Sequence, residues 1–134
     1  MDGVTKKRII MAKMGLDAHD NALRIVSKWL KDSGYEIIYA GLYNSPEKIL
    51  KMVIEEDADA IGLSFHGGEH LYHTSRLIEL LKTHNLTHIK IFVGGIIAPF
   101  DVEKLKKMGV SAVFTPGSRK EDILNVIKKS FDEN

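Results

Sequence analysis

An imidazole flanked by carboxylates lies in a polar stretch near the amino terminus, which reads Lys13-Met14-Gly15-Leu16-Asp17-Ala18-His19-Asp20-Asn21-Ala22. Because Asp17 and His19 are two residues apart, in extended backbone they point the same way, and the carboxylate can accept the second N–H of the imidazole. Such a carboxylate fixes the tautomer of a histidine that binds a metal. A lone Asp-x-His pair is equally typical of a solvated loop whose Asp or Asn caps a helix, so both interpretations stay open here.

The elements on either side of this stretch are predicted from their apolar patterns. The run at 9–12 is continuously apolar, as in a buried strand, and the apolar residues between Leu23 and Leu30 follow the period of one helix face. The stretch is therefore predicted to be the loop from a first strand to a first helix. In open parallel sheets, ligands bind at the carboxyl ends of the strands, where such loops lie.

The rest of the chain alternates between short apolar runs and longer amphipathic segments. Strands are predicted at 8–12, 36–40, 59–64, 90–93 and 112–114. Helices are predicted at 20–33, 46–56, 69–84, 100–108 and 120–131. Gly34 and Gly109 end two of these helices, because glycine readily adopts the left-handed turn after a helix. Ser45, followed by Pro46 in the first turn, and Ser118 are predicted to cap the helices after them.

Five strands, each followed by a helix, predict an α/β fold with one doubly wound parallel sheet covered on both faces. Right-handed crossovers leave few arrangements, and the Rossmann-like, flavodoxin-like strand order 2-1-3-4-5 is predicted. Residues 1–134 are predicted to form one domain. In this order the loops after the first and third strands, which carry His19 and Ser64, face each other across one crevice.

Glycines are concentrated just past the predicted strand ends, at Gly67-Gly68, Gly94-Gly95 and Gly117. A missing Cβ at such a place lets a ligand approach the backbone closely. Ordinary turn chemistry explains any one of these glycines. Together they predict an elongated ligand lying along the crevice.

Composition and charge exclude several classes of function. The 134 residues carry 19 basic and 18 acidic side chains, a net charge of +1, whereas a nucleic-acid interface needs a basic face. With no cysteine in the sequence, disulfides, thiol catalysis and cysteine-bound zinc are excluded. No apolar run approaches the length of a membrane span and no signal segment is recognisable, so we expect a cytoplasmic protein that binds neither membrane nor nucleic acid.

Three separated motifs resemble the cobalamin-binding domain of adenosylcobalamin-dependent mutases. The segment at 17–22 is similar to D-x-H-x-x-G, Ser64-Phe65-His66 to S-x-L, and Gly94-Gly95 to G-G. The flanking sequence looks most like the acyl-CoA mutase branch, the methylmalonyl-CoA mutase type, in the segments 13–17, 93–99 and 114–118. The resemblance covers essentially the whole chain, and three motifs after the expected strands are far more specific than any one of them.

The resemblance implies a role for each motif residue. His19 would displace the cofactor's own dimethylbenzimidazole and become the lower axial ligand of cobalt, with Asp17 and Lys13 behind it tuning its donor strength. Ser64 would hydrogen-bond the displaced nucleotide tail of the cofactor. The other residues implied to line the cofactor site are Ala18, Asp20, Asn21, Ala22, His66, Gly94, Gly95, Thr115, Pro116 and Gly117.

The sequence departs from the motifs at two positions. Ala22 stands where D-x-H-x-x-G has glycine, which adds a methyl group where the helix start meets the nucleotide tail. His66 stands where S-x-L has leucine, which puts a polar ring into a slot that is otherwise apolar.

The function implied by the resemblance is that of a cobalamin-binding subunit in an isomerase, a carbon-skeleton mutase that uses adenosylcobalamin. The barrel that would bind the acyl-CoA is absent from this sequence, so a large catalytic subunit is implied as partner. A corrinoid protein that carries methyl groups, and a cobalamin carrier or sensor without enzymatic function, are the alternatives.

Two further interpretations receive little support from the residues. The spacing of His66, His70 and His73, with Glu69, could place a zinc site on one helix face, but Gly67-Gly68 breaks the helical register. A phosphoacceptor receiver domain has the same predicted fold. It needs an aspartate after the third strand and a lysine after the fifth, where this sequence has Ser64 and Thr115.

Overall fold

The computed structural model describes residues 6–14, 21–66 and 68–132. Its strands form one parallel sheet in the order β2-β1-β3-β4-β5, which confirms the predicted α/β fold and strand order. The strands are β1 (Arg8–Met14), β2 (Glu36–Asn44), β3 (Ala60–Phe65), β4 (Lys90–Gly95) and β5 (Ala112–Phe114).

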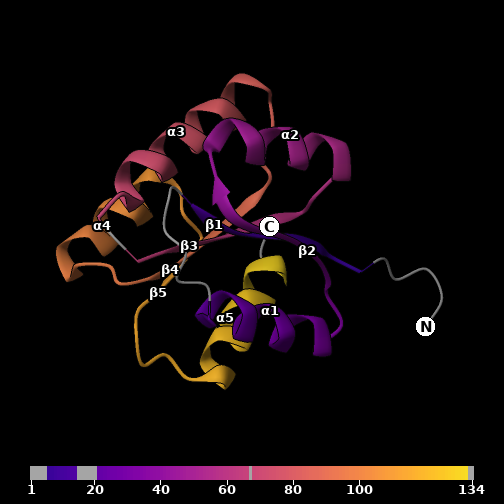
Figure 1. Cartoon of the computed structure of the whole chain (residues 1–134), viewed down its shortest axis with the longest axis vertical. Coiled ribbons are helices and arrows are strands. Elements are labelled where there is room, and N and C mark those ends of the chain that lie inside the picture. Colours follow the sequence, from indigo (N-terminus) through magenta and orange to yellow (C-terminus); the bar gives the residue numbers. More distant parts are fainter. Residues whose placement is uncertain (1–5, 15–20, 67, 133–134) are drawn as a thin grey trace.

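Helices cover both faces of this sheet. They are α1 (Asn21–Asp32), α2 (Pro46–Glu56), α3 (His70–Thr83), α4 (Pro99–Met108) and α5 (Lys120–Asp132). Helices α2, α3 and α4 lie on one face and α1 and α5 on the other (Figure 1). This three-layer arrangement buries the central strands on both sides, in agreement with their nearly unbroken apolar sequences.

Local signals in the sequence explain two of the helix ends, the start of α2 and the end of α4. Ser45 has an extended backbone, and its hydroxyl accepts a hydrogen bond from the backbone N–H of Lys48, so it caps α2 as predicted. Gly109 ends α4 in the left-handed conformation, with φ of 115°. The prediction for Ser118 is wrong: α5 begins at Lys120, and the Ser118 hydroxyl instead donates to the carbonyl of Thr115 at 2.7 Å.

Strands β1 and β2 extend to Met14 and Asn44, beyond the ends predicted from the sequence at residues 12 and 40. Irregular pairing continues the two strands past the predicted ends, with Ala12 opposite Gly41 and Met14 opposite Asn44. Asn44 holds this extension, because its side-chain amide donates to the carbonyls of Lys13 and Gly41 at 3.0 and 2.9 Å. The first strand therefore places Lys13 inside the sheet.

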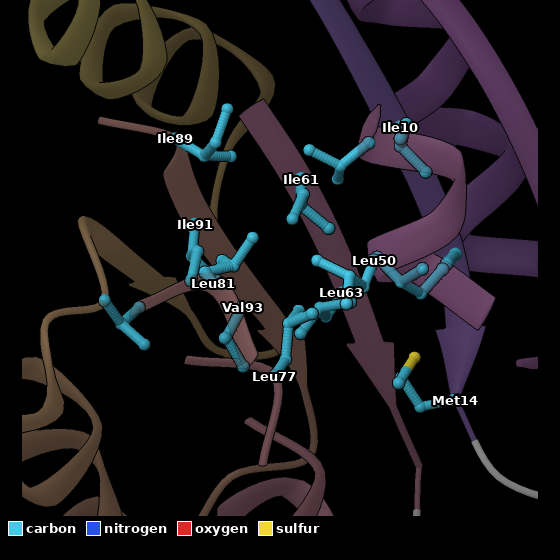
Figure 2. Packing of buried hydrophobic residues seen from close by; sticks show 14 of the residues in the cluster. Ile10, Met14, Leu50, Ile61, Leu63, Leu77, Leu81, Ile89, Ile91 and Val93 are labelled. Atoms are coloured by element: carbon cyan, nitrogen blue, oxygen red, sulfur yellow. The ribbon is translucent and has the colours of Figure 1, made fainter. Parts of the chain in front are cut away.

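The two faces of the sheet bury different clusters of apolar side chains. On the face of α2, α3 and α4, side chains of β1, β3 and β4 pack against Leu50 of α2 and against Leu77 and Leu81 of α3 (Figure 2). On the other face, the smaller cluster includes Met11 and Phe92 from the sheet, with Leu23, Leu30, Ile123 and Ile127 from α1 and α5. Ser64 and Gly94, which belong to two of the motifs, lie on this second face.

Candidate functional site

One row across the sheet includes residues from two of the motifs and from the segments that flank them. Strand register places Lys13 of β1 opposite Ser64 of β3, Ser64 opposite Gly94 of β4, and Gly94 opposite Phe114 of β5. Because side chains alternate along a strand, all four positions face α1 and α5. Ser64 and Gly94, from two of the three motifs, therefore lie side by side near the carboxyl ends of the strands, between Lys13 and Phe114 from the segments that flank the motifs.

A cavity of about 350 Å³ lies between this row and the helices α1 and α5. This volume is within the range of small-molecule binding sites. Its walls are mainly apolar and include Ala22, Val26 and Trp29 of α1 and Ile123 and Ile127 of α5. Its rim is formed by His66, by Ile96 and by the loop from Thr115 to Ser118.

Two glycines, Gly62 and Gly94, lie on the floor of the cavity. A Cβ at Gly94 would make only ordinary contact, 3.7 Å from the carbonyl oxygen of Phe114, so the fold itself does not require a glycine there. A Cβ at Gly62 would lie 2.6 Å from Sδ of Met11, at the flexible end of that side chain. Both residues line the cavity. At Gly94 the missing side chain leaves space that the chain does not fill, whereas at Gly62 the end of Met11 occupies that space.

Gly95 has a different reason to be glycine. Its φ is 125°, and a Cβ would lie 1.8 Å from the carbonyl oxygen of Phe65. The close approach of the backbone at the ends of β3 and β4 therefore requires glycine at this position, whether or not a ligand is bound. In the Gly94-Gly95 motif, the first glycine leaves space in the cavity and the second allows the chain to turn.

Lys13 is almost completely buried, with 1% of its surface exposed. It lies on the cavity face of β1 and is the first residue of the stretch 13–22 that carries His19. Burying an ammonium group is unfavourable unless a polar or charged partner compensates it. The strand thus places the Lys13 side chain at the cavity wall, at the position opposite half-buried Ser64 of the next strand.

The structure brings together most of the predicted site residues that it describes. Those lining the cavity are Lys13, Ala22, Ser64, His66, Gly94, Gly95, Thr115, Pro116 and Gly117. Asn21 is exposed at the start of α1 and is not among the lining residues. Asp17, Ala18, His19 and Asp20 lie outside the described residues.

Sequence reasoning missed several residues of the cavity. Met11, Gly62 and Phe92 form a second row two residues before Lys13, Ser64 and Gly94. The alternation of strand side chains is the signal that predicts this second row. Trp29 was assigned only to the apolar face of a helix, and no local pattern separates a cavity wall from a packed core.

Of the three histidines in the zinc interpretation, His70 and His73 each contact a different carboxylate. Nε2 of His70 lies 2.8 Å from Asp101, and Nε2 of His73 lies 3.1 Å from Glu69. His66 is exposed at the cavity rim. Within the described residues no group of three or more His, Asp or Glu side chains is arranged to hold a metal ion.

Among the described residues, no helix combines the length and the apolar character needed to cross a bilayer. The cytoplasmic location stays a prediction.

Comparison with known proteins agrees with the motifs. The family described as the B12 binding domain matches residues 7–124. The chain is 36% identical to the pivalyl-CoA mutase small subunit of Xanthobacter autotrophicus, over 93% of this chain and 84% of that one. It is 31% identical to the 2-hydroxyisobutanoyl-CoA mutase small subunit of Aquincola tertiaricarbonis, over 92% of this chain and 91% of that one. Methylmalonyl-CoA mutase of Escherichia coli is 30% identical over 98% of this chain, which spans 19% of that protein.

A solved structure shares the fold. A cobalamin-binding protein from Desulfitobacterium hafniense superposes with a TM-score of 0.80 at 20% identity, covering 93% of this chain and 59% of that one. The resemblance to cobalamin-binding mutase domains is thereby confirmed by the family match, the acyl-CoA mutase relatives and the shared fold. The chain belongs to the family of B12-binding domains.

Proposed function

We propose that this chain is the cobalamin-binding subunit of an adenosylcobalamin-dependent carbon-skeleton mutase of the acyl-CoA type. The position of the cavity carries the proposal: its floor is the row of motif residues, and it lies at the end of β1, where the stretch with His19 begins. Two relatives that match nearly the whole chain are named as small subunits of acyl-CoA mutases, which supports the role of a separate subunit.

The cavity fits the nucleotide tail of cobalamin in its chemistry. Its apolar walls, with Trp29 and Phe114 among them, suit an aromatic base, and Ser64 and Thr115 carry hydroxyls for a ribose or phosphate. The space at Gly94 admits a ligand close to the strand. We propose that His66, Gly95, Pro116 and Gly117 complete the wall around the tail.

The stretch at 13–22 is proposed to hold the cobalt. His19 would bind the cobalt, Asp17 would accept the second N–H of the imidazole, and Lys13 would support Asp17 from the end of β1. Ala18, Asp20, Asn21 and Ala22 surround the ligand. When bound, adenosylcobalamin supplies a carbon radical by homolysis of its cobalt–carbon bond, while this chain binds it, orients it and sets its axial ligand.

Cofactor binding tests the proposal directly. Trp29 is the only tryptophan in the sequence and it lines the cavity, so its fluorescence should be quenched when hydroxocobalamin is added. The visible spectrum should show the base-off form, and electron paramagnetic resonance of the cob(II)alamin complex should show an axial nitrogen from His19. His88→Ala, at an exposed histidine just before β4, is the matched control. His19→Ala with an unchanged nitrogen signal would rule out the ligand assignment.

A large catalytic subunit is the proposed partner. We expect the purified chain, loaded with adenosylcobalamin, to isomerise no acyl-CoA until that subunit is added. Turnover by the chain alone would contradict this division of labour. Capture of a methyltransferase in place of a mutase subunit would favour the corrinoid carrier.

A further inference from the structure

A buried hydrogen bond joins the first turns of α3 and α4. Nε2 of His70 lies 2.8 Å from Oδ2 of Asp101, and the two side chains are 6% and 11% exposed. Because a carboxylate only accepts hydrogen bonds, Nε2 of His70 is the donor. The two residues are 31 positions apart in sequence, so the bond is a tertiary contact between two helix starts.

As far as the structure describes the chain, the starts of α3 and α4 lack conventional side-chain caps. The residues before the two helices are Glu69 and Ala98, and in the described part of the chain neither makes a side-chain cap. Asp101 lies in the first turn of α4, where a carboxylate interacts favourably with the helix dipole. The pair therefore fixes the two helix starts to each other.

The same helix starts follow the two loops that form one side of the cavity rim. His66 and Ile96, the residues after β3 and β4, both line the cavity. Near the strands, the backbone N–H of Ile96 donates to the carbonyl of Phe65 at 3.1 Å. Where the loops enter their helices, His70 donates to Asp101. The two rim loops are thus joined at both ends.

Phe65 contacts both the strand end and the helix start of the rim loops. Its ring centroid lies 6.1 Å from that of His70 and 6.3 Å from that of His73, on which it stacks. Its carbonyl oxygen occupies the space that a side chain at Gly95 would need. Phe65, the last residue of β3, is thus packed between the His70 ring and the end of β4.

We propose that His70 and Asp101 form a latch that positions the cavity rim for cobalamin. Neither residue lines the cavity, so both are positioning residues that act through His66 and Ile96. The hydrogen bond between His70 and Asp101 holds His66 and Ile96 in place before the cofactor binds. Binding therefore does not have to meet the entropic cost of ordering them. This inference rests on the proposed function, because it names what holds that same site in shape.

Three variants separate the latch from a general effect on folding. His70→Ala removes the donor to Oδ2 of Asp101 and, among the described residues, leaves this buried carboxylate with only the longer ion pair to Lys104, at 3.9 Å, so we expect hydroxocobalamin to bind about tenfold more weakly. Asp101→Asn keeps an oxygen that accepts from His70, and we expect its affinity to stay within about threefold of the unaltered chain. His70→Leu with Asp101→Leu replaces both polar groups by apolar ones, a change that often preserves stability.

The double leucine variant decides the question even where His70→Ala fails to fold. It should unfold near the same urea concentration as the unaltered chain and yet bind hydroxocobalamin more weakly. Amide exchange should become faster at His66, at 68–69 and at 96–98 while the central strands keep their protection. Arg76→Ala is the matched control, because Arg76 lies on α3 but forms exposed ion pairs with Glu47 and Glu79.

The outcomes also separate this inference from the proposed function. No binding of hydroxocobalamin by the unaltered chain overturns the proposed function. Binding by the unaltered chain, with equal affinity and unchanged rim exchange in the double leucine variant, overturns the latch alone. An affinity loss in Asp101→Asn as large as in His70→Ala also overturns it, because the retained acceptor should rescue the contact.

Discussion

Alanine at each position of the Gly94-Gly95 pair should separate cofactor binding from folding. Gly94 is not in the left-handed region, and its Cβ would make only an ordinary contact with Phe114. Replacing glycine where the backbone permits it restricts the unfolded chain and stabilises a protein by about 0.4–1 kcal/mol. We therefore expect Gly94→Ala to raise the free energy of unfolding of the apoprotein by up to about 1 kcal/mol.

The same methyl group should weaken cofactor binding, because it enters the space left for the tail. An added methyl in a close-packed site costs about 1–3 kcal/mol, which corresponds to about 5- to 150-fold weaker binding. Gly95→Ala should behave in the opposite way. Its φ of 125° and the overlap with Phe65 strain the fold itself, and the backbone conformation alone costs about 1–3 kcal/mol in the apoprotein.

Urea unfolding without cofactor and hydroxocobalamin titration of Trp29 fluorescence measure the two effects separately. Two results would refute the reasoning. If Gly94→Ala binds with unchanged affinity, the row on the cavity floor does not contact the ligand. If Gly94→Ala destabilises the apoprotein as much as Gly95→Ala does, the distinction between the two glycines is mistaken.

Three further substitutions test other parts of the site. Ala22→Gly should loosen the start of α1 by about 1 kcal/mol but bind hydroxocobalamin more tightly, because the methyl group at the cavity wall is removed; weaker binding in a titration would show that a preformed helix matters more. His66→Leu should bind equally or more tightly, and a loss of bound zinc, measured by elemental analysis, would instead favour the metal interpretation. Asn44→Ala should lower the free energy of unfolding by about 1–3 kcal/mol, because the buried carbonyls of Lys13 and Gly41 lose their donor; an unchanged urea midpoint would mean that these bonds do not hold the end of β1.

The sequence was sufficient to predict the architecture, because the architecture follows from patterns that span only a few neighbouring residues. Strand and helix periods, Ser45 before Pro46 and Gly109 after a helix are all encoded within a few residues. Right-handed crossovers then leave few strand orders. The extension of β2 was not predictable in this way, since it depends on Asn44 bonding to Lys13 across 31 positions.

The candidate site was predictable only in part. Positions two residues before Lys13, Ser64 and Gly94 follow from strand alternation, so the second row could have been derived. The latch between His70 and Asp101 could not, because no local pattern indicates that two helix starts will meet. The different reasons for Gly94 and Gly95 likewise depend on which atoms of other strands lie nearby.

The two faces of the sheet are packed unequally, and a bound ligand would fill the larger cavity, on the side of α1 and α5. The α2–α4 face holds a pocket of about 100 Å³, while the α1–α5 face encloses a cavity of about 350 Å³. A ligand that binds only the folded state stabilises it in proportion to the logarithm of its concentration, and here the gain falls on α1 and α5. We expect chains made while the cofactor is scarce to open this half first and to be degraded sooner. The abundance of the subunit would then follow the supply of its cofactor without a dedicated regulator.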